Sequence, residues 1–439
     1  MLIQRARLLD GAVVDIRADQ CIVDVAEHLV PSAGESVFDA GQHTVIPGLH
    51  DHHVHLHSAA AALTSVPVGP REVHGRNDLA RVLAEAAIGE DGWIRAVGYH
   101  EAVAGPLDRE TLDEVAPAVP VRVQHRSGIL WTLNSAGLAW VGLPDHPDGR
   151  LRSSDQNWSN SLQRRETGLA EVSRRLASYG VTGVTEATPD LGIEDMVKFA
   201  EAHRHGDLLQ QVTCLAPGKR ILHDDGLDLA QLTRWIGARH DAGGTVALHC
   251  VTAAQLVVTI AALDSAGTRP GDRIEHAAVV PDDCLSDLAR LGVIVATQPN
   301  FVAERGDQYL ADVPADEHHQ LWRVASLLAA DVKVAMSTDL PFGDADPWAA
   351  MRAAVHRTTA SGAVLGPAER VDARTALQMF LGEPHRPTRP RTVAPGQPAN
   401  LCVIAAPPDE LLRELDADLV AATIVEGSVV FERAGIRTT

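Results

Sequence analysis

The chain reads VIPGLHDHHVH from Val45 to His55, an apolar segment that ends in a cluster of histidines. In an extended strand, residues two apart share a face, so His53 and His55 point the same way and can bind one ion. A histidine-rich surface turn would show the same letters. The segment therefore predicts a metal site only if further ligands come from elsewhere in the chain.

Candidate partners occur at the ends of three later apolar segments. TVALHC ends near His249, DRIEHA contains His276, and VAMSTD leads into Asp339. Parallel α/β barrels build their active sites at the carboxyl ends of their strands, where such side chains converge. A single histidine at a strand end is commonly a hydrogen-bonded core residue. Three such positions, following a His-x-His pair, indicate a shared metal site.

The middle of the chain alternates short apolar strands with amphipathic helices such as LDLAQLTRWIGARHDAGG, the pattern of a parallel α/β fold. Only Pro217 and Gly218 separate the third predicted strand from the fourth, which is too few residues for a crossover. One of these two strands is therefore expected to be misassigned or irregular. This alternation implies either a barrel or a doubly wound sheet. The predicted fold is a (β/α)8 TIM-like barrel with eight strands, Val45–Leu49, Val181–Glu186, Gln211–Ala216, Lys219–His223, Thr245–Cys250, Arg273–His276, Val293–Thr297 and Lys333–Thr338.

The two chain ends show short apolar runs between turn residues, without a helical period. Examples are CIVDVAEHLV near the start and SVVFER near the end. We predict a small β-sandwich domain formed by both termini, from residues 1–48 and 380–439, and a barrel domain over residues 49–379. Residues from about 58 to 168 are too many for an ordinary barrel loop, so they are predicted to form an insert between the first and second barrel strands.

Composition excludes several classes of protein. The chain has 439 residues, 45% of them apolar, but no uninterrupted apolar run long enough for a membrane span. Its net charge of −20, without a basic stripe, argues against a nucleic-acid partner. The first residues do not form a secretory signal, and the five cysteines are scattered without a CxxC pair. These features predict a cytoplasmic protein that binds neither nucleic acid nor membrane.

The motifs together resemble the amidohydrolase superfamily over essentially the whole chain. VIPGLHDHHVHL resembles the first-strand motif of that superfamily. The chain is more closely similar to the YtcJ-like or amidohydrolase 3 branch, which includes N-substituted formamide deformylases. The segments that carry this likeness are VRVQHRSGILWTLNSAGLAWVGL, TGVTEA, VALHCVTAAQL, GDRIEHAAVVP and STDLPFGDADPWAAMRAAVHR.

The resemblance implies a set of metal ligands and a divalent metal, with zinc expected and one or two ions per chain. A binuclear centre also needs an anionic bridge, which the resemblance implies is a carboxylated lysine from the fourth strand. Lys219 in PGKRILHDDG matches that position best, and Glu186 at the end of TGVTEA is the alternative bridge. The implied ligands are His53, His55, Lys219, His249, His276 and Asp339.

The insert departs from the branch pattern, which commonly has Gly-His before its Asn-Ser element. Here Gly128 is followed by Ile129. The candidates for substrate-binding residues in this region are His125, Arg126 and Trp131.

The resemblance implies hydrolysis of a carbon–nitrogen bond in a small-molecule amide, formamide, carbamate or cyclic amide by attack of a metal-bound hydroxide. Asp339 would be the catalytic residue that takes the proton from water and passes it to the leaving nitrogen. A mononuclear deaminase is an alternative, although Thr252 stands where deaminases of this fold place a glutamate. Lactone or ester hydrolysis is another, and a non-catalytic binding protein is the least favoured reading. A homodimer is expected.

Overall fold

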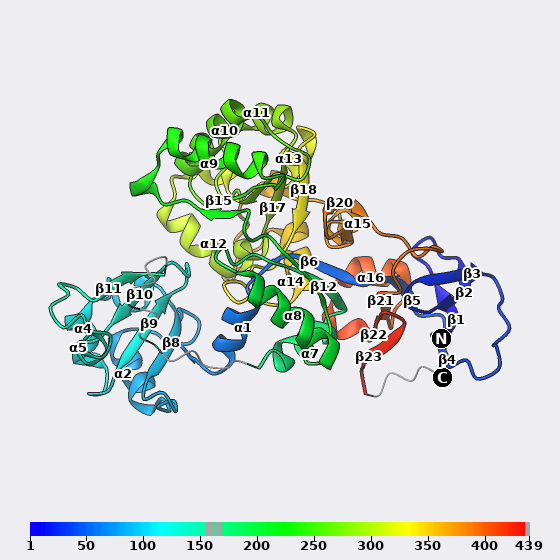
Figure 1. Cartoon of the computed structure of the whole chain (residues 1–439), viewed down its shortest axis with the longest axis horizontal. Helices are drawn as coiled ribbons and strands as arrows, with labels where there is room; N and C mark the ends of the chain where they lie inside the picture. The colour runs from blue at the N-terminus through cyan, green and yellow to red at the C-terminus, as the bar shows by residue number, and fades with distance from the viewer. Residues whose placement is uncertain (154–157, 159–161, 163–167, 435–439) are drawn as a thin grey trace. The chain divides into compact units, whose positions relative to one another are not determined.

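The computed structural model describes residues 1–153, 158, 162 and 168–434. It divides into two compact units, one formed by residues 1–56 and 169–439 and the other by residues 57–168. The chain enters the second unit directly after the histidine cluster and returns before the next parallel strand. Figure 1 labels the elements of both units.

Strands from both chain ends share one hydrogen-bonded sheet (Figure 1). The link between the ends is the antiparallel pairing of β5 with β21, in which Val45 faces Val403. Buried aliphatic side chains from both ends form one core on this sheet. Backbone hydrogen bonds join all eight strands into one sheet, whereas a sandwich has two sheets packed face to face. The sandwich arrangement therefore stays a prediction. These are β1 (Leu2–Arg7), β2 (Val13–Ala18), β3 (Ile22–Ala26), β4 (Val37–Asp39), β5 (Thr44–Pro47), β21 (Leu401–Ile404), β22 (Val420–Val425) and β23 (Ser428–Glu432).

The predicted first barrel strand, Val45–Leu49, was placed wrongly. Most of it is β5 of the terminal sheet, and the strand that carries the histidines is β6, Leu49–Val54. The break falls at Gly48, where a Cβ atom would lie 2.2 Å from Thr182 Cγ2. Glycine is needed there because the backbone passes directly over a neighbouring strand. Both strands are buried along their whole length, so no polar residue marks the boundary between them.

Eight other strands of this unit form two parallel sheets, and β19 (Gly382–Glu383) pairs antiparallel with β20 (Arg386–Pro390) in a separate two-stranded sheet. A three-stranded sheet has the order β13-β12-β6, with β12 at Val181–Glu186 and β13 at Gln211–Cys214. A five-stranded sheet has the order β14-β15-β16-β17-β18. No ladder joins the two sheets among the described residues, so the predicted closed barrel stays a prediction. The strands of the larger sheet are β14 (Lys219–Ile221), β15 (Ala247–Cys250), β16 (Arg273–His276), β17 (Ile294–Thr297) and β18 (Lys333–Met336).

The expected irregularity between the third and fourth strands has a specific form. Both β13 and β14 exist, but they belong to different sheets and do not pair. The connecting residues make a tight turn in which Gly218 N donates to Leu215 O at 2.8 Å. No crossover is needed, because the two strands are not hydrogen-bonded neighbours.

Helices connect the parallel strands, and their ends follow local capping rules. Asp228 caps α9, and Thr252 caps α10 with Gln255 completing a capping box. Such caps fix where each helix begins relative to the strand end before it. The helices of this unit are α7 (Ala170–Ser178), α8 (Ile193–His205), α9 (Leu229–Asp241), α10 (Ala253–Ala266), α11 (Cys284–Leu291), α12 (Asn300–Asp312), α13 (Ala325–Ala329), α14 (Pro347–His356), α15 (Ala373–Gln378) and α16 (Pro408–Glu414).

The second unit has its own sheet, in the order β11-β10-β9-β8-β7, and its own buried clusters. Helix α1 (Leu56–Leu63) leads into it. Its other elements are β7 (Val66–Pro67), α2 (Arg76–Glu85), β8 (Ile94–Tyr99), α3 (Glu101–Ala104), α4 (Arg109–Val115), β9 (Val121–His125), β10 (Leu130–Leu133), α5 (Ser135–Trp140) and β11 (Arg150–Arg152).

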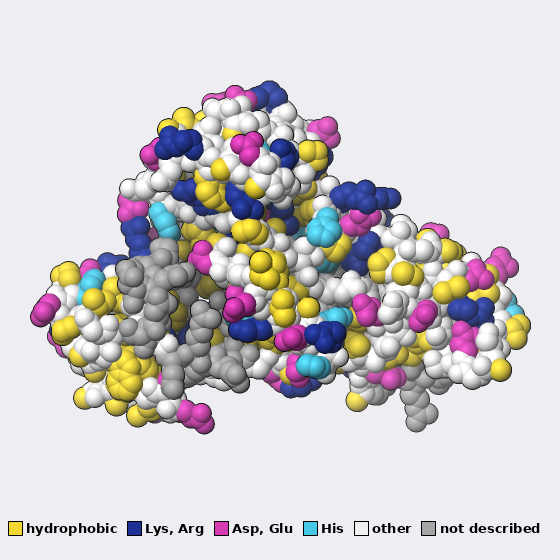
Figure 2. Space-filling view, viewed as in Figure 1, with side chains coloured by type: hydrophobic (Ala, Val, Ile, Leu, Met, Phe, Trp, Pro, Cys, Tyr) yellow, Lys and Arg dark blue, Asp and Glu magenta, His cyan; other side chains and the backbone are white. Residues whose placement is uncertain are grey.

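Charged side chains of both signs are interspersed on the face shown in Figure 2, without one continuous basic patch on that face. Among the described residues, the structure contains no helix that is both long and apolar enough to span a bilayer.

Candidate metal centre

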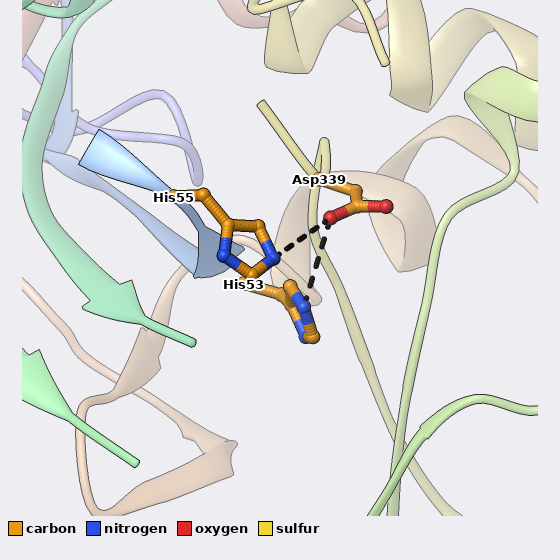
Figure 3. Close-up of side chains that lie close together, drawn as sticks. All are labelled: His53, His55 and Asp339. Carbon is orange, nitrogen blue, oxygen red and sulfur yellow. Dashed lines mark ion pairs between the residues drawn. The ribbon is translucent and has the colours of Figure 1, made fainter. Parts of the chain in front are cut away.

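Three of the predicted ligands meet where β6 and β18 end (Figure 3). His53 lies in β6 and His55 directly after it, and Asp339 follows β18. Asp339 Oδ1 lies 3.6 Å from His53 Nε2 and 3.5 Å from His55 Nε2. One ligand atom from each residue lies within 4.8 Å of the other two, which is close enough for one ion.

The remaining predicted ligands come from the five-stranded sheet. Lys219, at the start of β14, places its Nζ 3.1 Å from His53 Nε2. His276, at the end of β16, has its ring centroid 4.8 Å from that of His53. His249, in β15, has its ring centroid 4.4 Å from that of His276. The structure thus brings all the predicted ligands into one neighbourhood.

The hydrogen bonds of His53 and His55 indicate which ring nitrogen carries the proton. His53 Nδ1 lies 2.5 Å from Glu275 Oε2, an atom that only accepts when ionised. His55 Nδ1 lies 3.0 Å from Thr188 Oγ1. The Thr188 hydroxyl already donates to Glu186 Oε1, so it accepts from His55. Both rings therefore carry the proton on Nδ1 and leave a lone pair on Nε2.

The ring of His276 also carries its proton on Nδ1, and the partner of that nitrogen is neutral. Its Nδ1 lies 2.8 Å from Gln298 Oε1. The Gln298 amide nitrogen donates to Ser337 Oγ and to Ala296 O, which fixes the orientation of the amide. Gln298 Oε1 must then accept from His276, so this ring also keeps Nε2 unprotonated.

The arrangement of lone pairs fits a cation. Asp339 Oδ1 is buried and has no hydrogen-bond partner among the described residues. It faces the Nε2 atoms of His53 and His55, so three electron-rich atoms converge, and Lys219 Nζ lies 3.1 Å from the His53 nitrogen. Such an arrangement is unfavourable unless a positive charge lies between them. Imidazole nitrogen and carboxylate oxygen are ligands that divalent transition metals accept.

Burial keeps the site residues in the state that ligands need. Burial lowers the pKa of His53 well below its usual value, and the nearby Lys219 adds to this effect. Burial likewise lowers the pKa of His249 and His276. The pKa of Lys219 is lowered to about 8, also by burial. Neutral imidazoles bind metals, and a neutral amine is nucleophilic.

Backbone strain also occurs at this place. Three residues without glycine's freedom adopt positive φ, namely His276 at 72°, Ala277 at 46° and Asp339 at 59°. Such conformations cost of order 1 kcal/mol or more and persist where the surroundings impose them. Two of these residues are predicted ligands, so the fold accepts strain in order to aim their side chains.

Glu186, the alternative bridge, has other partners in the structure. Its Oε1 accepts from the backbone N–H and the hydroxyl of Thr188, and its Oε2 accepts from Leu56 N at 2.6 Å. Both carboxylate oxygens are therefore engaged, and the contact with Thr188 links Glu186 to His55.

His125 lies in the insert unit, in a cluster with His100 and Glu101. His125 Nε2 lies 3.2 Å from Glu101 Oε2, and His100 Nε2 lies 3.8 Å from the same oxygen. Backbone N–H groups of Ser127 and Ala102 donate to the Nδ1 atoms of His125 and His100. Neutral rings of this kind carry the proton on Nε2 and donate toward Glu101. That tautomer disfavours metal binding by this cluster, although its residues are close enough for it.

The other two predicted insert residues have structural partners. Trp131 is buried in an apolar cluster, with its ring centroid 6.2 Å from that of Trp158. The Arg95 guanidinium lies 5.1 Å from the Trp131 ring. Arg126 N donates to Tyr99 O. Packing accounts for Trp131, and the substrate contacts of His125, Arg126 and Trp131 stay predictions.

Sequence reasoning missed the residues that hold the ligands. Glu275, Gln298 and Thr188 each contact one ligand ring through its Nδ1 atom. A usable signal existed for Glu275, because the segment RIEH is predicted to be a strand of the barrel, where an ionised side chain is expensive to bury without a partner. Nothing in the sequence assigned that partner to His53.

A protein-family model and known proteins match most of the chain. The model of the amidohydrolase family matches residues 36–431. The chain is similar to the N-substituted formamide deformylase of Arthrobacter pascens, with 25% identity over 91% of this chain and 90% of that protein.

Solved structures share the fold at low sequence identity. An uncharacterized metal-dependent hydrolase from Pyrococcus horikoshii OT3 has a TM-score of 0.71 and 18% identity, covering 93% of this chain and 97% of that one. N-isopropylammelide isopropylaminohydrolase from Burkholderia multivorans has a TM-score of 0.56 and 14% identity, covering 98% of each chain.

Proposed function

The chain belongs to the amidohydrolase family, and we propose that it is a metal-dependent hydrolase that cleaves a carbon–nitrogen bond next to a carbonyl. The observation that carries this proposal is the unpartnered Asp339 Oδ1 facing the lone pairs of His53 and His55. That arrangement suits a cation and, beside it, a water molecule. The metal could be zinc, since histidine and carboxylate ligands suit it.

We assign the ligand positions to His53, His55, His249, His276 and Asp339, with Lys219 as the bridge. A divalent cation held there supplies a Lewis acid that lowers the pKa of water and polarises the substrate carbonyl. Asp339 accepts the proton of the attacking water at a carboxylate oxygen. It then returns this proton to the departing nitrogen, which leaves as a neutral amine.

The bridge is better assigned to Lys219 than to Glu186. The oxygens of Glu186 already accept three hydrogen bonds from Thr188 and Leu56. The Lys219 amine lies 3.1 Å from His53 Nε2, and its lowered pKa of about 8 leaves part of it neutral near neutral pH. A neutral amine adds carbon dioxide to give a carbamate and one proton, which converts a cation into an anionic bridge for two ions.

The substrate class is inferred from the family and from Thr252. An amide, formamide, carbamate or cyclic amide fits the family and the similar formamide deformylase. Thr252 caps helix α10 and occupies the position where a deaminase would need an acidic group for its ring substrate. Because Thr252 is not acidic, a mononuclear deaminase ranks below an amide hydrolase and is the second candidate. A lactone or ester hydrolase on the same residues is the third.

We further propose that the two parallel sheets close into one (β/α)8 barrel. Asp339 N donates to His53 O at 3.0 Å and His55 N donates to Leu340 O at 2.8 Å, which ties the segment after β18 to β6. The division into a small β domain, residues 1–48 and 380–439, and a barrel, residues 49–379, belongs to this proposal.

We also propose a cellular compartment, a class of ligand and an oligomeric state for the chain. None of the five cysteines, all of which the structure describes, forms a disulfide, which suits a reducing cytoplasm. The partner proposed for the site is a small molecule, with neither nucleic acid nor membrane involved. A homodimer is proposed as the assembly.

The test is elemental analysis of the purified chain, combined with a hydrolysis screen of N-formyl, N-acyl and cyclic amides. Two ions per chain and turnover of an amide are expected. One ion with deamination of a heterocycle would replace the proposal by the deaminase. A chain that binds no divalent metal at micromolar concentration would overturn it.

A further inference from the structure

Glu275 stands out among the residues that surround the metal centre. It is fully buried in β16, and its Oε2 lies 2.5 Å from His53 Nδ1. Its other oxygen accepts from Arg273 Nε at 2.7 Å. Arg273 is itself fixed, because one of its Nη atoms donates to His52 O at 2.8 Å. The carboxylate is thus held at both oxygens in one orientation.

Three of the four proposed ligand rings have a recorded partner at Nδ1, and these three partners differ in charge. His55 donates to the neutral hydroxyl of Thr188, and His276 donates to the neutral amide of Gln298. The partner of His53 is a carboxylate that contacts the ring directly. A carboxylate that accepts from Nδ1 fixes the tautomer and makes Nε2 a stronger electron donor. His53 is also the ring whose Nε2 faces both Lys219 and Asp339.

The contact also crosses between sheets. His53 lies in β6 of the three-stranded sheet, and Glu275 lies in β16 of the five-stranded sheet. The ligands themselves are divided in the same way, since Lys219, His249 and His276 belong to the larger sheet. A bond between Glu275 and His53 therefore holds the two halves of the ligand set in register.

We propose that Glu275 is a positioning residue of the metal centre, whose negative charge and fixed carboxylate orient His53 and raise the affinity for the cation. This inference rests on the proposed function. It extends that function to a residue that neither binds the metal nor touches the substrate. The charge of Glu275, beyond its ability to accept a hydrogen bond, is what the inference requires.

The chain contains a matched control for loss of a buried carboxylate. Glu369 is paired with Arg323 Nε at 3.2 Å, and the exposed fractions of the two side chains are 3% and 6%. The corresponding values for Glu275 and Arg273 are 0% and 6%. Glu369 accepts hydrogen bonds from Val324 and Ser326, and no contact with a ligand histidine is recorded for it in the described part of the chain. Both substitutions to glutamine remove one buried charge beside an arginine.

The experiment compares Zn²⁺ affinity of the full-length wild type, Glu275→Gln and Glu369→Gln by competition with a chromophoric chelator. Melting temperatures of the metal-free proteins and the absorption spectra of Co²⁺-loaded proteins are recorded in parallel. We expect affinity to fall about 10- to 100-fold in Glu275→Gln and less than twofold in Glu369→Gln. The Co²⁺ spectrum should change in the first variant alone, while both metal-free proteins lose thermal stability.

Each other outcome has a defined meaning. Wild-type affinity in Glu275→Gln, or an equal loss in Glu369→Gln, would overturn the positioning role while leaving the proposed function intact. A wild type that binds no Zn²⁺ would overturn both. If Glu275→Gln does not fold, Glu275→Asp keeps the negative charge but shortens the side chain by one methylene group, which withdraws the carboxylate from His53 Nδ1. Weakened Zn²⁺ binding in Glu275→Asp is then expected, and unchanged binding would overturn the inference.

Discussion

Asp339 combines properties that buried carboxylates rarely share. It is 6% exposed, its φ of 59° lies in the left-handed region, and its Oδ1 has no partner among the described residues. A strained and unsatisfied acceptor is costly, and it persists in native structures where it has a task. The task that we propose for this position is to bind a cation and to accept a proton.

The substitution Asp339→Asn tests the proton transfer separately from metal binding. The amide oxygen can still contact a cation, but the group cannot take a proton from water. We expect metal content to be retained while kcat for amide hydrolysis falls about 10²- to 10⁴-fold. The control is Asp372→Asn, because Asp372 caps helix α15 and asparagine caps equally well. Retained turnover in Asp339→Asn would remove this residue from the catalytic role.

Lys219 gives a prediction about pH. Its pKa of about 8, below the usual lysine value, describes the metal-free protein. Only the neutral amine adds carbon dioxide, so the reactive fraction rises from about a tenth at pH 7 to about nine tenths at pH 9. At a constant concentration of dissolved carbon dioxide, recovery of two ions by metal-free protein should therefore become faster as pH rises through 8. Recovery at equal rates without carbon dioxide, or in Lys219→Ala, would contradict the carbamate bridge.

The candidate ligands could be proposed from the sequence, whereas the residues that contact them could not, for a local reason. Strand-end positions pointed to His249 and His276 as candidates because parallel strands end at a common edge. Alternation along β16 predicts that Glu275 and His276 point to opposite faces. Instead His276 has a φ of 72°, which breaks the alternation, and both residues reach His53.

The end of helix α14 depends on one buried guanidinium. Arg357 is fully buried, adopts a φ of 56° at the helix C-terminus, and donates to the carbonyl oxygens of Leu365, Trp322 and Leu321. These carbonyls belong to the segments that follow α12 and α14. One side chain therefore satisfies three acceptors that are far from water.

The substitution Arg357→Met should destabilise the protein strongly. It leaves three buried carbonyls without this donor, and each unsatisfied group costs about 1–3 kcal/mol. We expect the free energy of unfolding in urea to fall by about 3 kcal/mol or more. The matched variant Arg174→Met removes an exposed arginine paired with Glu171, for which a loss of under about 1 kcal/mol is expected. Similar midpoints for the two variants would show that the carbonyls find other donors.

The elements themselves were predictable where a polar residue marks their ends. Helix α9 begins after Asp228 and ends before the glycines that the sequence pattern uses as its stop. Strands β5 and β6 show the opposite case. They are buried along their whole length and adjoin at Gly48, so hydrophobicity alone merges them into one strand. Their separation is imposed by pairing partners, β21 for one and β12 for the other.

Long-range pairing also limits what the sequence says about the whole chain. The β-rich pattern of both ends predicts strands, and strands from both ends do share a sheet. The ladder between β5 and β21 joins residues more than 350 positions apart, and only the folded chain shows that register. Closure of the parallel strands into a barrel is an inference of the same long-range kind, so it depends on contacts rather than on local pattern.

The insert satisfies the physical requirements of an independent domain, so its folding can be tested apart from the rest of the chain. Residues 57–168 form a compact unit with a five-stranded sheet and two buried clusters of their own. Units of about 100 residues with a separate core commonly fold alone. We therefore expect the excised segment 57–168 to give a mixed α/β circular dichroism spectrum and a cooperative thermal transition. The same segment with Leu112→Asp, which puts a charge at a fully buried position, should lose the transition. A coil spectrum for the unsubstituted segment would mean that its core needs the rest of the chain to form.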